Sequence, residues 1–344
     1  MTGAGKTAVV LFNLGGPDEP NAVQPFLFNL FNDPAIIGVP TPIRWLIATL
    51  ISRRRAPVAQ EIYEHLGGGS PLLANTQAQA DALQASLGGE VRCFIAMRYW
   101  HPFADETAAE VKAFAPDRVV LLPLYPQFST TTTGSSIKDW MRAAKAAGLE
   151  VPTKTICCYF DNTAFVDAIA ARVRHMLDEF SEIRPRVLFT AHGLPKKIVA
   201  AGDPYQWQIE QTAAAIVTAI DRTGLDWITC YQSRVGPLEW IQPYTSDVLE
   251  RAGADGVPVI VVPIGFTSEH SETLVELDIE YRELADKAGV PSYRRVDTVG
   301  ADGNFIDGLA SIVKHAVAQS EPLTSDESGC RCPEMHTRCM FRMR

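Results

Sequence analysis

A histidine and five glutamates follow a strand-like run in the stretch PIGFTSEHSETLVELDIEY, residues 263–281. The glutamates are Glu269, Glu272, Glu276, Glu280 and, just beyond this stretch, Glu283. At about 100° per residue, all five fall inside roughly an 80° arc of one helix. Such a row of carboxylates can bind a divalent cation or pass protons between water and a buried site. The alternative is the solvated face of an ordinary amphipathic helix.

Two observations favour a functional row of carboxylates. The row begins where the apolar run at residues 257–266 ends. Glu272, Glu276 and Glu280 repeat every four residues, whereas a regular helix repeats at about 3.6. A repeat of four suits a slightly widened helix, and π-type turns occur disproportionately at functional sites. We therefore predict these three glutamates as metal ligands.

Two histidines also lie where predicted strands end. His270 lies two residues before Glu272, and His192 follows the run at 187–191 and precedes Gly193. An imidazole can accept a proton or bind a metal near neutral pH, and a nearby carboxylate can complete either kind of site. His192, Glu272 and His270 are therefore the candidate catalytic residues. The alternative for His192 is a loop histidine that hydrogen-bonds a backbone group.

Three cysteines lie close together in a hydrophilic C-terminal tail, CRCPEMHTRC at residues 330–339. Cys330, Cys332 and Cys339 offer three thiolates, which suit zinc or an iron–sulfur cluster. His336 would complete a zinc site within the tail, whereas a cluster with four cysteine ligands needs one more thiol from the rest of the chain. The candidates for that thiol are Cys93, Cys157, Cys158 and Cys230. The alternative is a disordered tail that binds nothing.

The stretch GVPTPIRWLIATLISRRR at residues 38–55 is apolar and aromatic, and it ends in three arginines. It is too short to span a bilayer. One interpretation is a buried helix. The other is an exposed apolar lip with basic anchors, which lies against an amphipathic ligand or a membrane surface.

A scaffold of alternating strands and helices must position these residues. Eight short runs are rich in apolar and β-branched residues, as in strands buried on both faces. They lie at 8–13, 91–97, 118–125, 153–159, 187–191, 227–232, 257–266 and 292–296. Helix-like stretches separate them, for example at 75–87, 137–147, 165–180, 207–223 and 304–318. This alternation predicts parallel sheets with right-handed crossovers.

Four predicted strands precede residue 160 and four follow it. We therefore predict an α/β fold of two doubly wound, Rossmann-like domains, each with a parallel four-stranded sheet. The expected boundaries are residues 1–150, 151–320 and, for the cysteine-rich tail, 321–344. Ligands of such folds bind at the carboxyl ends of strands, in the crevice between lobes. Polar stretches such as FTAHGLP and YQSRVGPLEW gather at these ends, which predicts a shared cleft.

The composition excludes some classes of protein. The chain has 344 residues, of which 47% are hydrophobic, and its formal net charge is −9. An acidic chain of this kind does not favour a nucleic-acid partner. The N-terminus lacks the basic region of a signal peptide, so we expect a cytoplasmic protein. The seven cysteines are then thiols or metal ligands, because disulfides are rare in the cytosol.

These motifs together resemble the protoporphyrin ferrochelatases, enzymes that insert ferrous iron into a porphyrin to make haem. The resemblance covers essentially the whole chain. It rests on LFNLGGPDEP (11–20), LGGGSP (66–71), MRYWHP (97–102), LYPQFSTTTTGSS (124–136), AHGLPKK (191–197), GDPY (202–205), YQSRVGPLEW (231–240) and the stretch at 263–281. It implies a fold of two Rossmann-like lobes with a cleft between them.

The resemblance also implies roles for individual residues. The residues that match His192 and Glu272 face each other across the porphyrin, where one accepts pyrrole protons and one handles the metal. His192 thus joins Glu272, Glu276 and Glu280 as a candidate metal ligand. Six further positions match residues around the porphyrin or the mouth of its pocket, where guanidinium groups suit propionates. These are Arg54, Arg55, Tyr63, Arg98, Tyr99 and Trp240.

Some members of the family carry a 2Fe–2S cluster on a C-terminal cysteine trio like that of Cys330, Cys332 and Cys339. In animal members the fourth ligand lies in the stretch that matches QFSTTTT, where this chain has Thr130. The fourth thiol must therefore come from elsewhere. Adjacent strand residues point to opposite faces, so only one of Cys157 and Cys158 suits, and the likeness to bacterial relatives favours Cys158.

Two alternatives differ from a protoporphyrin ferrochelatase. A coproporphyrin or cobalt chelatase is the closer one, and the apolar stretch at 38–51 argues for the less polar protoporphyrin. A porphyrin or metal carrier without turnover explains a cleft but not the pairing of His192 with a row of acids. The expected partners are a porphyrin and ferrous iron. The sequence is also compatible with a homodimer and with peripheral contact with the inner membrane.

Overall fold

Two compact units make up the chain in this computed structural model, which describes residues 5–180, 184–326 and 329–343. The first unit comprises Met1–Tyr125, Ser129–Cys157 and Leu309–Cys330. The second comprises Pro126–Phe128, Cys158–Gly308 and Arg331–Arg344. The chain therefore passes between the units several times, and we describe each unit by itself.

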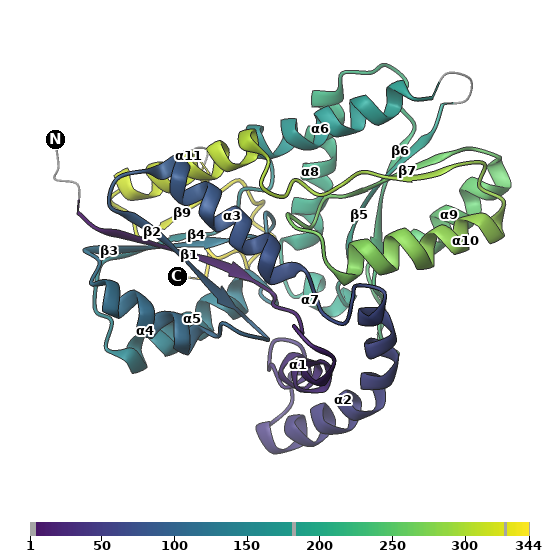
Figure 1. Ribbon diagram of the computed structural model, residues 1–344. Coiled ribbons are helices and arrows are strands. Elements are labelled where there is room, and N and C mark those ends of the chain that lie inside the picture. The colour runs from purple at the N-terminus through teal and green to yellow at the C-terminus, as the bar shows by residue number, and fades with distance from the viewer. Residues whose placement is uncertain (1–4, 181–183, 327–328, 344) are drawn as a thin grey trace. The chain divides into compact units, whose positions relative to one another are not determined.

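The first unit is built on a parallel five-stranded sheet (Figure 1). Its strands are β1 (Thr7–Asn13), β2 (Val91–Met97), β3 (Arg118–Pro123), β4 (Thr153–Ile156) and β9 (Leu323–Thr324), in the order β2-β1-β3-β4-β9. Every residue of the central strand β1 is buried. A strand covered on both faces has no solvent side, which explains its unbroken apolar run from Ala8 to Phe12.

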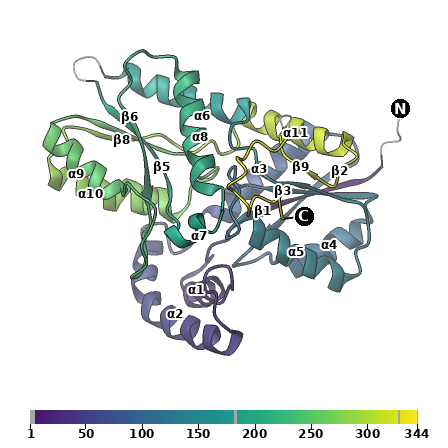
Figure 2. The ribbon, with the colours of Figure 1, turned by 180° about the vertical axis from the view of Figure 1, so that it is seen from behind.

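Helices cover both faces of this sheet. They are α3 (Leu72–Leu87) and the second half of α11 (Gly303–Ala318) on one face, with α4 (Ala104–Phe114) and α5 (Thr133–Ala147) on the other (Figures 1 and 2). A short 3₁₀ turn, η1 (Pro20–Ala22), leads into α1 (Val23–Phe31), which packs against the long helix α2 (Thr41–Glu64). Helix α2 contains the apolar stretch singled out in the sequence.

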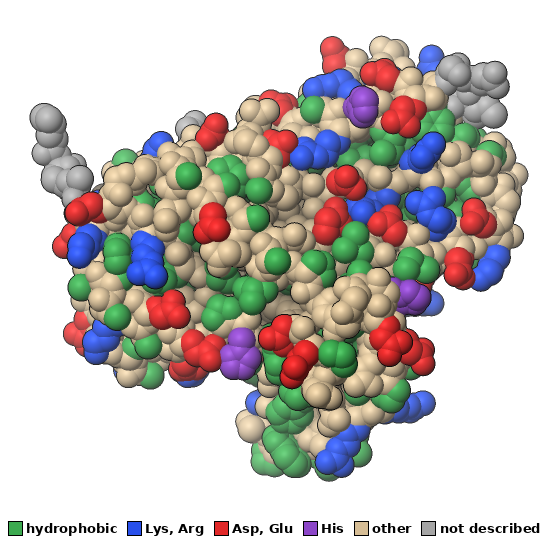
Figure 3. All heavy atoms as spheres, in the orientation of Figure 1, with side chains coloured by type: hydrophobic (Ala, Val, Ile, Leu, Met, Phe, Trp, Pro, Cys, Tyr) green, Lys and Arg blue, Asp and Glu red, His purple; other side chains and the backbone are tan. Residues whose placement is uncertain are grey.

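Much of α2 is exposed. The side chains of Ile43, Trp45, Leu46 and Leu50 are each more than half exposed, so this stretch is not a buried helix. In Figure 3, hydrophobic and basic side chains lie together on the surface of the α1–α2 segment. Among the described residues, no helix is both long and apolar enough to cross a membrane. The interpretation as an exposed apolar lip therefore agrees with the structure.

The second unit has a parallel four-stranded sheet in the order β6-β5-β7-β8. The strands are β5 (Arg186–His192), β6 (Trp227–Gln232), β7 (Val259–Pro263) and β8 (Tyr293–Arg295). Helices α6 (Thr163–Asp178) and α8 (Tyr205–Ile220) cover one face, and α9 (Thr245–Asp255) and α10 (Tyr281–Ala288) cover the other (Figure 2). Helix α7 (Lys196–Ala200) follows β5, and the helix η2 (Glu272–Glu280) precedes α10.

The predicted fold class is confirmed, and all eight predicted strands are present with small shifts at their ends. Two details differ. The first sheet has a fifth strand, β9, because the chain returns after α11 and pairs with β4. The predicted boundaries, 1–150 and 151–320, follow the chain once, whereas residues 309–330 group with the first unit.

Candidate active site

The row of glutamates lies on a π-helix. Residues Glu272–Glu280 form η2, and the N–H of Tyr281 donates to the carbonyl of Glu276, five residues earlier. This is the widened helix that the repeat of four predicted. The opposite face of η2 anchors it, because Leu277 is fully buried in the core beneath α9 and α10. The helix can therefore present Glu272 and Glu276 from one fixed position.

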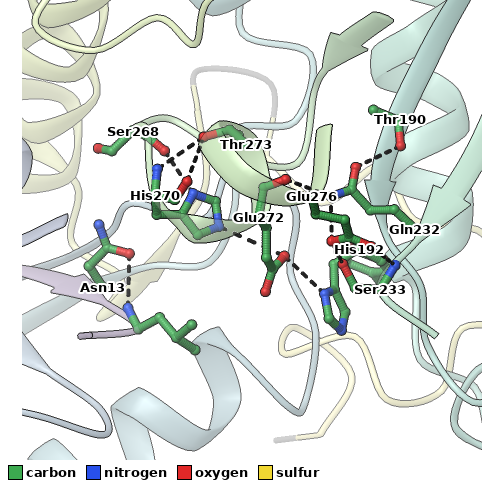
Figure 4. Close-up of polar contacts among 12 residues, drawn as sticks. Asn13, Thr190, His192, Gln232, Ser233, Ser268, His270, Glu272, Thr273 and Glu276 are labelled. Carbon is green, nitrogen blue, oxygen red and sulfur yellow. Dashed lines mark hydrogen bonds and ion pairs between the residues drawn. The ribbon is translucent and has the colours of Figure 1, made fainter. Parts of the chain in front are cut away.

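His192 and Glu272 are in direct contact (Figure 4). The Nδ1 atom of His192 lies 3.0 Å from the Oε2 atom of Glu272. The two residues come from different segments, but β5 and β7 are neighbours in the sheet, so their carboxyl ends lie at one edge. This corrects the implication that the two side chains face each other across the porphyrin. They form one pair.

His270 lies beside the same carboxylate. Its Nδ1 lies 3.1 Å from the carbonyl oxygen of Ser268, which can only accept, so Nδ1 carries the hydrogen. Its Nε2 then faces Glu272 at 3.8 Å from Oε2. The ring is buried and packs edge-on against Phe266, with 4.6 Å between ring centroids. His270 is therefore a close, buried neighbour of Glu272.

Charge and burial compete in setting the protonation of the pair. Burial alone favours a neutral imidazole, but the charge of Glu272 and its hydrogen bond outweigh burial and raise the pKa of His192. Burial likewise opposes ionisation of Glu272, yet His192 and then His270 lower its pKa well below the usual range. Each residue of the pair therefore favours the charged form of the other.

Glu276 lies one turn further along the row and is held by three donors. Its Oε1 accepts from the backbone N–H of Ser233 at 2.8 Å, and its Oε2 accepts from the hydroxyl of Ser233 at 2.5 Å. The amide of Gln232 donates to Oε2 at 3.2 Å. Burial and the charge of Glu272 raise the pKa of Glu276 in spite of these bonds. Two neighbouring carboxylates thus have pKa values shifted in opposite directions, as at many sites of proton transfer.

The remaining glutamates of the predicted row have different surroundings. Glu280 is exposed at the end of η2, so the row runs outward from a partly buried Glu272 to the surface. Glu283 is exposed and pairs with Lys287 at 3.2 Å. Glu269 is turned onto Arg295, with 3.0 Å between Oε1 and Nη1. The row therefore consists of Glu272, Glu276 and Glu280, the three residues predicted as metal ligands.

Arg295 is a residue that the sequence did not single out. Its side chain is 6% exposed and forms a two-pronged contact with Asp278, at 2.7 Å for both Nε and Nη2. The same guanidinium reaches Glu269, so it holds a residue before η2 and one inside it. An arginine fork fixes such partners more strictly than a lysine could. Arg295 thereby positions the helix that carries Glu272 and Glu276.

Two aromatic residues lie beside His192. The hydroxyl of Tyr205 donates to the carbonyl of His192 at 3.0 Å, which fixes the backbone at the end of β5. The ring of Trp240, predicted to bind substrate, lies 6.1 Å from the His192 ring between centroids. Its indole N–H donates to the carbonyl of Val235 at 3.1 Å. Trp240 is thus placed next to the His192–Glu272 pair, and its contact with substrate stays a prediction.

The other predicted substrate-binding residues lie in the first unit. Arg54 and Arg55 are exposed on α2, with the Arg55 guanidinium 5.9 Å from the centroid of the Phe31 ring. Tyr63 is buried where α1 and α2 pack together. The substrate contacts predicted for these three residues stay predictions.

Arg98 and Tyr99 both contact Asp33, a buried residue between α1 and α2. The Oδ2 atom of Asp33 accepts from Arg98 Nη2 at 2.8 Å and from the Tyr99 hydroxyl at 2.9 Å. The hydroxyl of Ser135 donates to the same oxygen at 2.6 Å. Burial and the charge of Asp33 raise the pKa of Tyr99 well above its usual value. The polar atoms of this group therefore hold the α1–α2 segment, a role that the sequence did not predict.

The tail cysteines form a compact group. The sulfur atoms of Cys330, Cys332 and Cys339 all lie within 4.8 Å of one another. Cys158 is buried, and its sulfur and that of Cys332 contact one amide nitrogen, Nε2 of Gln208, at 3.6 Å and 3.2 Å. Sulfur donors in this arrangement fit a thiolate-bound metal.

Neither His336 nor Cys157 shares this arrangement. The ring of His336 packs on that of Trp207, with 5.8 Å between centroids. Cys157 groups with the first unit, where its backbone N–H donates to the carbonyl of Thr324 at 2.8 Å.

Two parallel sheets wrapped by helices, with a histidine–carboxylate pair at the strand exits, define a protein of the chelatase fold. A solved structure titled "SirB from Bacillus subtilis with Fe3+" matches with a TM-score of 0.55 and 13% identity, over 92% of this chain and 97% of that one. At this identity the match bears on the fold alone.

Sequence comparisons identify the family. The ferrochelatase family model matches residues 6–317. The chain is 52% identical to the ferrochelatase of Caulobacter vibrioides (strain NA1000 / CB15N) over 98% of both chains. It is 46% identical to the ferrochelatase of Pelagibacter ubique (strain HTCC1062), over 97% of this chain and 98% of the relative. The chain belongs to the ferrochelatase family.

Proposed function

We propose that this chain inserts Fe²⁺ into protoporphyrin IX and releases two protons, which forms protohaem in the last step of haem biosynthesis. As a member of the ferrochelatase family it is an enzyme that inserts iron into a porphyrin. The direct contact between His192 and Glu272 carries the mechanistic part of the proposal. Neither a cobalt chelatase nor a carrier without turnover is favoured by the comparisons.

His192 accepts the pyrrole protons in this proposal. Because Glu272 accepts a hydrogen bond from Nδ1, the neutral ring carries its lone pair on Nε2. The side chain is 35% exposed, so a substrate can reach it. When Nε2 takes a proton from a pyrrole nitrogen, the adjacent carboxylate stabilises the imidazolium that forms. The raised pKa of His192 reflects this stabilisation.

Glu276 and Glu280 carry the released protons outward in this proposal. The raised pKa of Glu276 lets it take up a proton near the imidazolium. Glu280 is exposed at the far end of the π-helix and exchanges protons with water. The three carboxylates of Glu272, Glu276 and Glu280, together with His192, also attract ferrous iron, the metal substrate. Its charge and preference for oxygen and imidazole ligands match this set.

Porphyrin recognition is assigned to the exposed apolar side chains of α2 together with Arg54 and Arg55. A dicarboxylate porphyrin has a large apolar face and few charges, so it gains more from an apolar surface than a tetracarboxylate porphyrin does. The same surface is suited to peripheral contact with a membrane, because it combines tryptophan and leucine with nearby arginines.

Comparison of substrates tests the proposal. The purified protein, kept without air, receives Fe²⁺ with either protoporphyrin or coproporphyrin, and metalloporphyrin is followed by absorbance over many turnovers. We expect kcat/KM to be higher for protoporphyrin. A higher value for coproporphyrin would reassign the substrate, and a single stoichiometric burst would identify a carrier.

We also propose that Cys158, Cys330, Cys332 and Cys339 hold a 2Fe–2S cluster. Three of these sulfurs are grouped, and the fourth contacts the same amide as Cys332. Such a cluster supplies one-electron redox chemistry. Here the ligands would also join the tail to the body of the chain, and metal binding would add to stability.

Matched cysteine variants test the cluster. The protein purified without air is expected to be reddish and to contain about two irons and two sulfides per chain. Cys158→Ser should lose the colour and part of the thermal stability, whereas Cys157→Ser should lose neither. A colourless protein with one zinc would contradict the cluster but not the proposed chelatase activity, because that proposal rests on other residues.

A further inference from the structure

Gln208 is a buried residue of α8 whose amide contacts two cysteine sulfurs. Its side chain is fully buried. The Nε2 atom lies 3.2 Å from the sulfur of Cys332 and 3.6 Å from that of Cys158. An amide nitrogen is only a donor, so the two sulfurs are its acceptors. Sequence patterns did not indicate this residue.

The orientation of the amide is determined by its other end. The Oε1 atom accepts from the backbone N–H of Phe128 at 2.7 Å. A backbone N–H can only donate, so the oxygen must face Phe128 and the NH₂ group must face the sulfurs. The donor at Phe128 therefore determines which end of the amide is oxygen and which is nitrogen.

A closed polar network holds Gln208 in place. One turn later on α8, the hydroxyl of Thr212 donates to the carbonyl of Phe160 at 2.6 Å and contacts that of Gln208 at 2.9 Å. The buried amide of Gln127 donates to Thr212 Oγ1 and to the carbonyl of Ile264, both at 3.0 Å. The donor aimed at the sulfurs is thus rigidly positioned.

A donor in this position matches charged sulfur better than neutral sulfur. A thiol is a weak acceptor, whereas a thiolate bound to a metal carries charge and accepts strongly. A fully buried amide that faces two sulfurs therefore stabilises them in the state in which they bind a metal.

We propose that Gln208 donates one N–H each to the sulfurs of Cys158 and Cys332 and holds them in their metal-binding arrangement. This inference rests on the proposed cysteine site, and it adds to that site a residue that is not a ligand. Partners of this kind orient metal ligands, and their loss typically costs about 10–100-fold in metal affinity. For an iron–sulfur cluster, hydrogen bonds to the sulfurs also set the reduction potential.

The test compares the release of metal from full-length variants purified without air. Gln208→Leu removes both donors at similar volume, and Gln208→Met removes them with a flexible apolar chain. Gln206→Leu is the matched control, because Gln206 lies on the same helix but donates to Glu210 at the exposed surface. Each protein is mixed with excess chelator, and the visible absorbance and the released iron or zinc are followed over time.

We expect metal to leave Gln208→Leu and Gln208→Met about 10–100-fold faster than wild type, with Gln206→Leu unchanged. If the wild type contains a cluster, its potential should be less negative than that of either variant. Equal retention in wild type and in a folded Gln208 variant, judged by circular dichroism, would overturn the inference and leave the cysteine site standing. Zinc in the wild type would overturn the cluster but not the role of Gln208. A wild type without bound metal would overturn both.

Discussion

Two ion pairs differ in exposure and in the number of their hydrogen-bond partners. They are His192–Glu272 in the second unit and Arg98–Asp33 in the first. Asp33 is 2% exposed, and its carboxylate accepts from Arg98, Tyr99, Ser135 and the backbone N–H of Ala35. The side chains of His192 and Glu272 are 35% and 23% exposed. In the second pair, the ring atom Nε2 is available for a proton.

From this difference we expect Arg98–Asp33 to stabilise the fold and His192–Glu272 to take part in proton transfer. A carboxylate with four donors is fixed in one position by them, and its bonds hold the α1–α2 segment around it. Glu272 instead contacts a histidine that is partly exposed to solvent. It can stay in contact with the imidazole while the imidazole gains or loses a proton. The pKa shifts agree with this expectation. The pKa values of His192, Glu272 and Glu276 are shifted by burial and by one another's charges. Variants at the two pairs should therefore affect different properties.

The largest effect on catalysis is expected for His192→Ala. Removal of the proton acceptor should lower kcat by about 10²–10⁴-fold, with little change in folding because the side chain is partly exposed at the end of β5. Steady-state metallation of protoporphyrin and the thermal unfolding midpoint measure the two properties. A variant that unfolds, or one with near wild-type kcat, would contradict the division between the pairs.

The opposite pattern is expected for Asp33→Ala. Loss of the carboxylate leaves Arg98 without its main partner and removes acceptors from Tyr99 and Ser135. Breaking a buried pair typically costs about 3–5 kcal/mol, and partial exposure of Arg98 favours the lower end. Urea unfolding measures this loss. Asp105→Ala is the control, since the Asp105–Arg142 pair is more than half exposed and exposed pairs contribute about 0–1 kcal/mol.

A smaller effect, on binding rather than on turnover, is expected for the exposed face of α2. The double variant Trp45→Glu, Leu46→Glu places charges on side chains that are each 54% exposed. We expect KM for protoporphyrin to rise more than KM for coproporphyrin, while kcat and the unfolding midpoint stay near those of wild type. An unchanged KM ratio would remove α2 from porphyrin recognition.

Local patterns in the sequence predicted much of the fold and part of the site. Runs of buried β-branched residues located all eight main strands, and the four-residue repeat of glutamates predicted the π-helix. Both signals lie within a few residues of chain. Strand β9 has two residues and pairs with β4 from the far end of the chain, so no local pattern could indicate it.

Contacts between distant segments were not predictable. Ser135 reaches Asp33 across 102 residues, and Gln208 reaches Cys332 across 124. Neither pairing leaves a spacing in the sequence. The contact between His192 and Glu272 depends on β5 and β7 being neighbours, which follows from strand order rather than from either motif. The resemblance named both residues, but it implied that they lie apart, whereas the order of the strands brings them into contact.

The finest test of the role proposed for His192 and Glu272 is the pH dependence of Glu272→Gln. In the wild type the pKa of His192 is raised, so the imidazole stays protonated to higher pH and the rate should increase as pH rises through that pKa. The amide introduced by this substitution carries no charge, so the pKa of His192 should fall. The acid limb of the kcat profile should then move to lower pH, while kcat on the plateau drops because the imidazolium loses its stabilising partner. Glu283→Gln should leave the profile unchanged, since Glu283 pairs with Lys287 at the surface. If the acid limb stays in place in Glu272→Gln, the titrating group is not His192. If it moves equally in both variants, a general field rather than the contact of 3.0 Å sets the pKa.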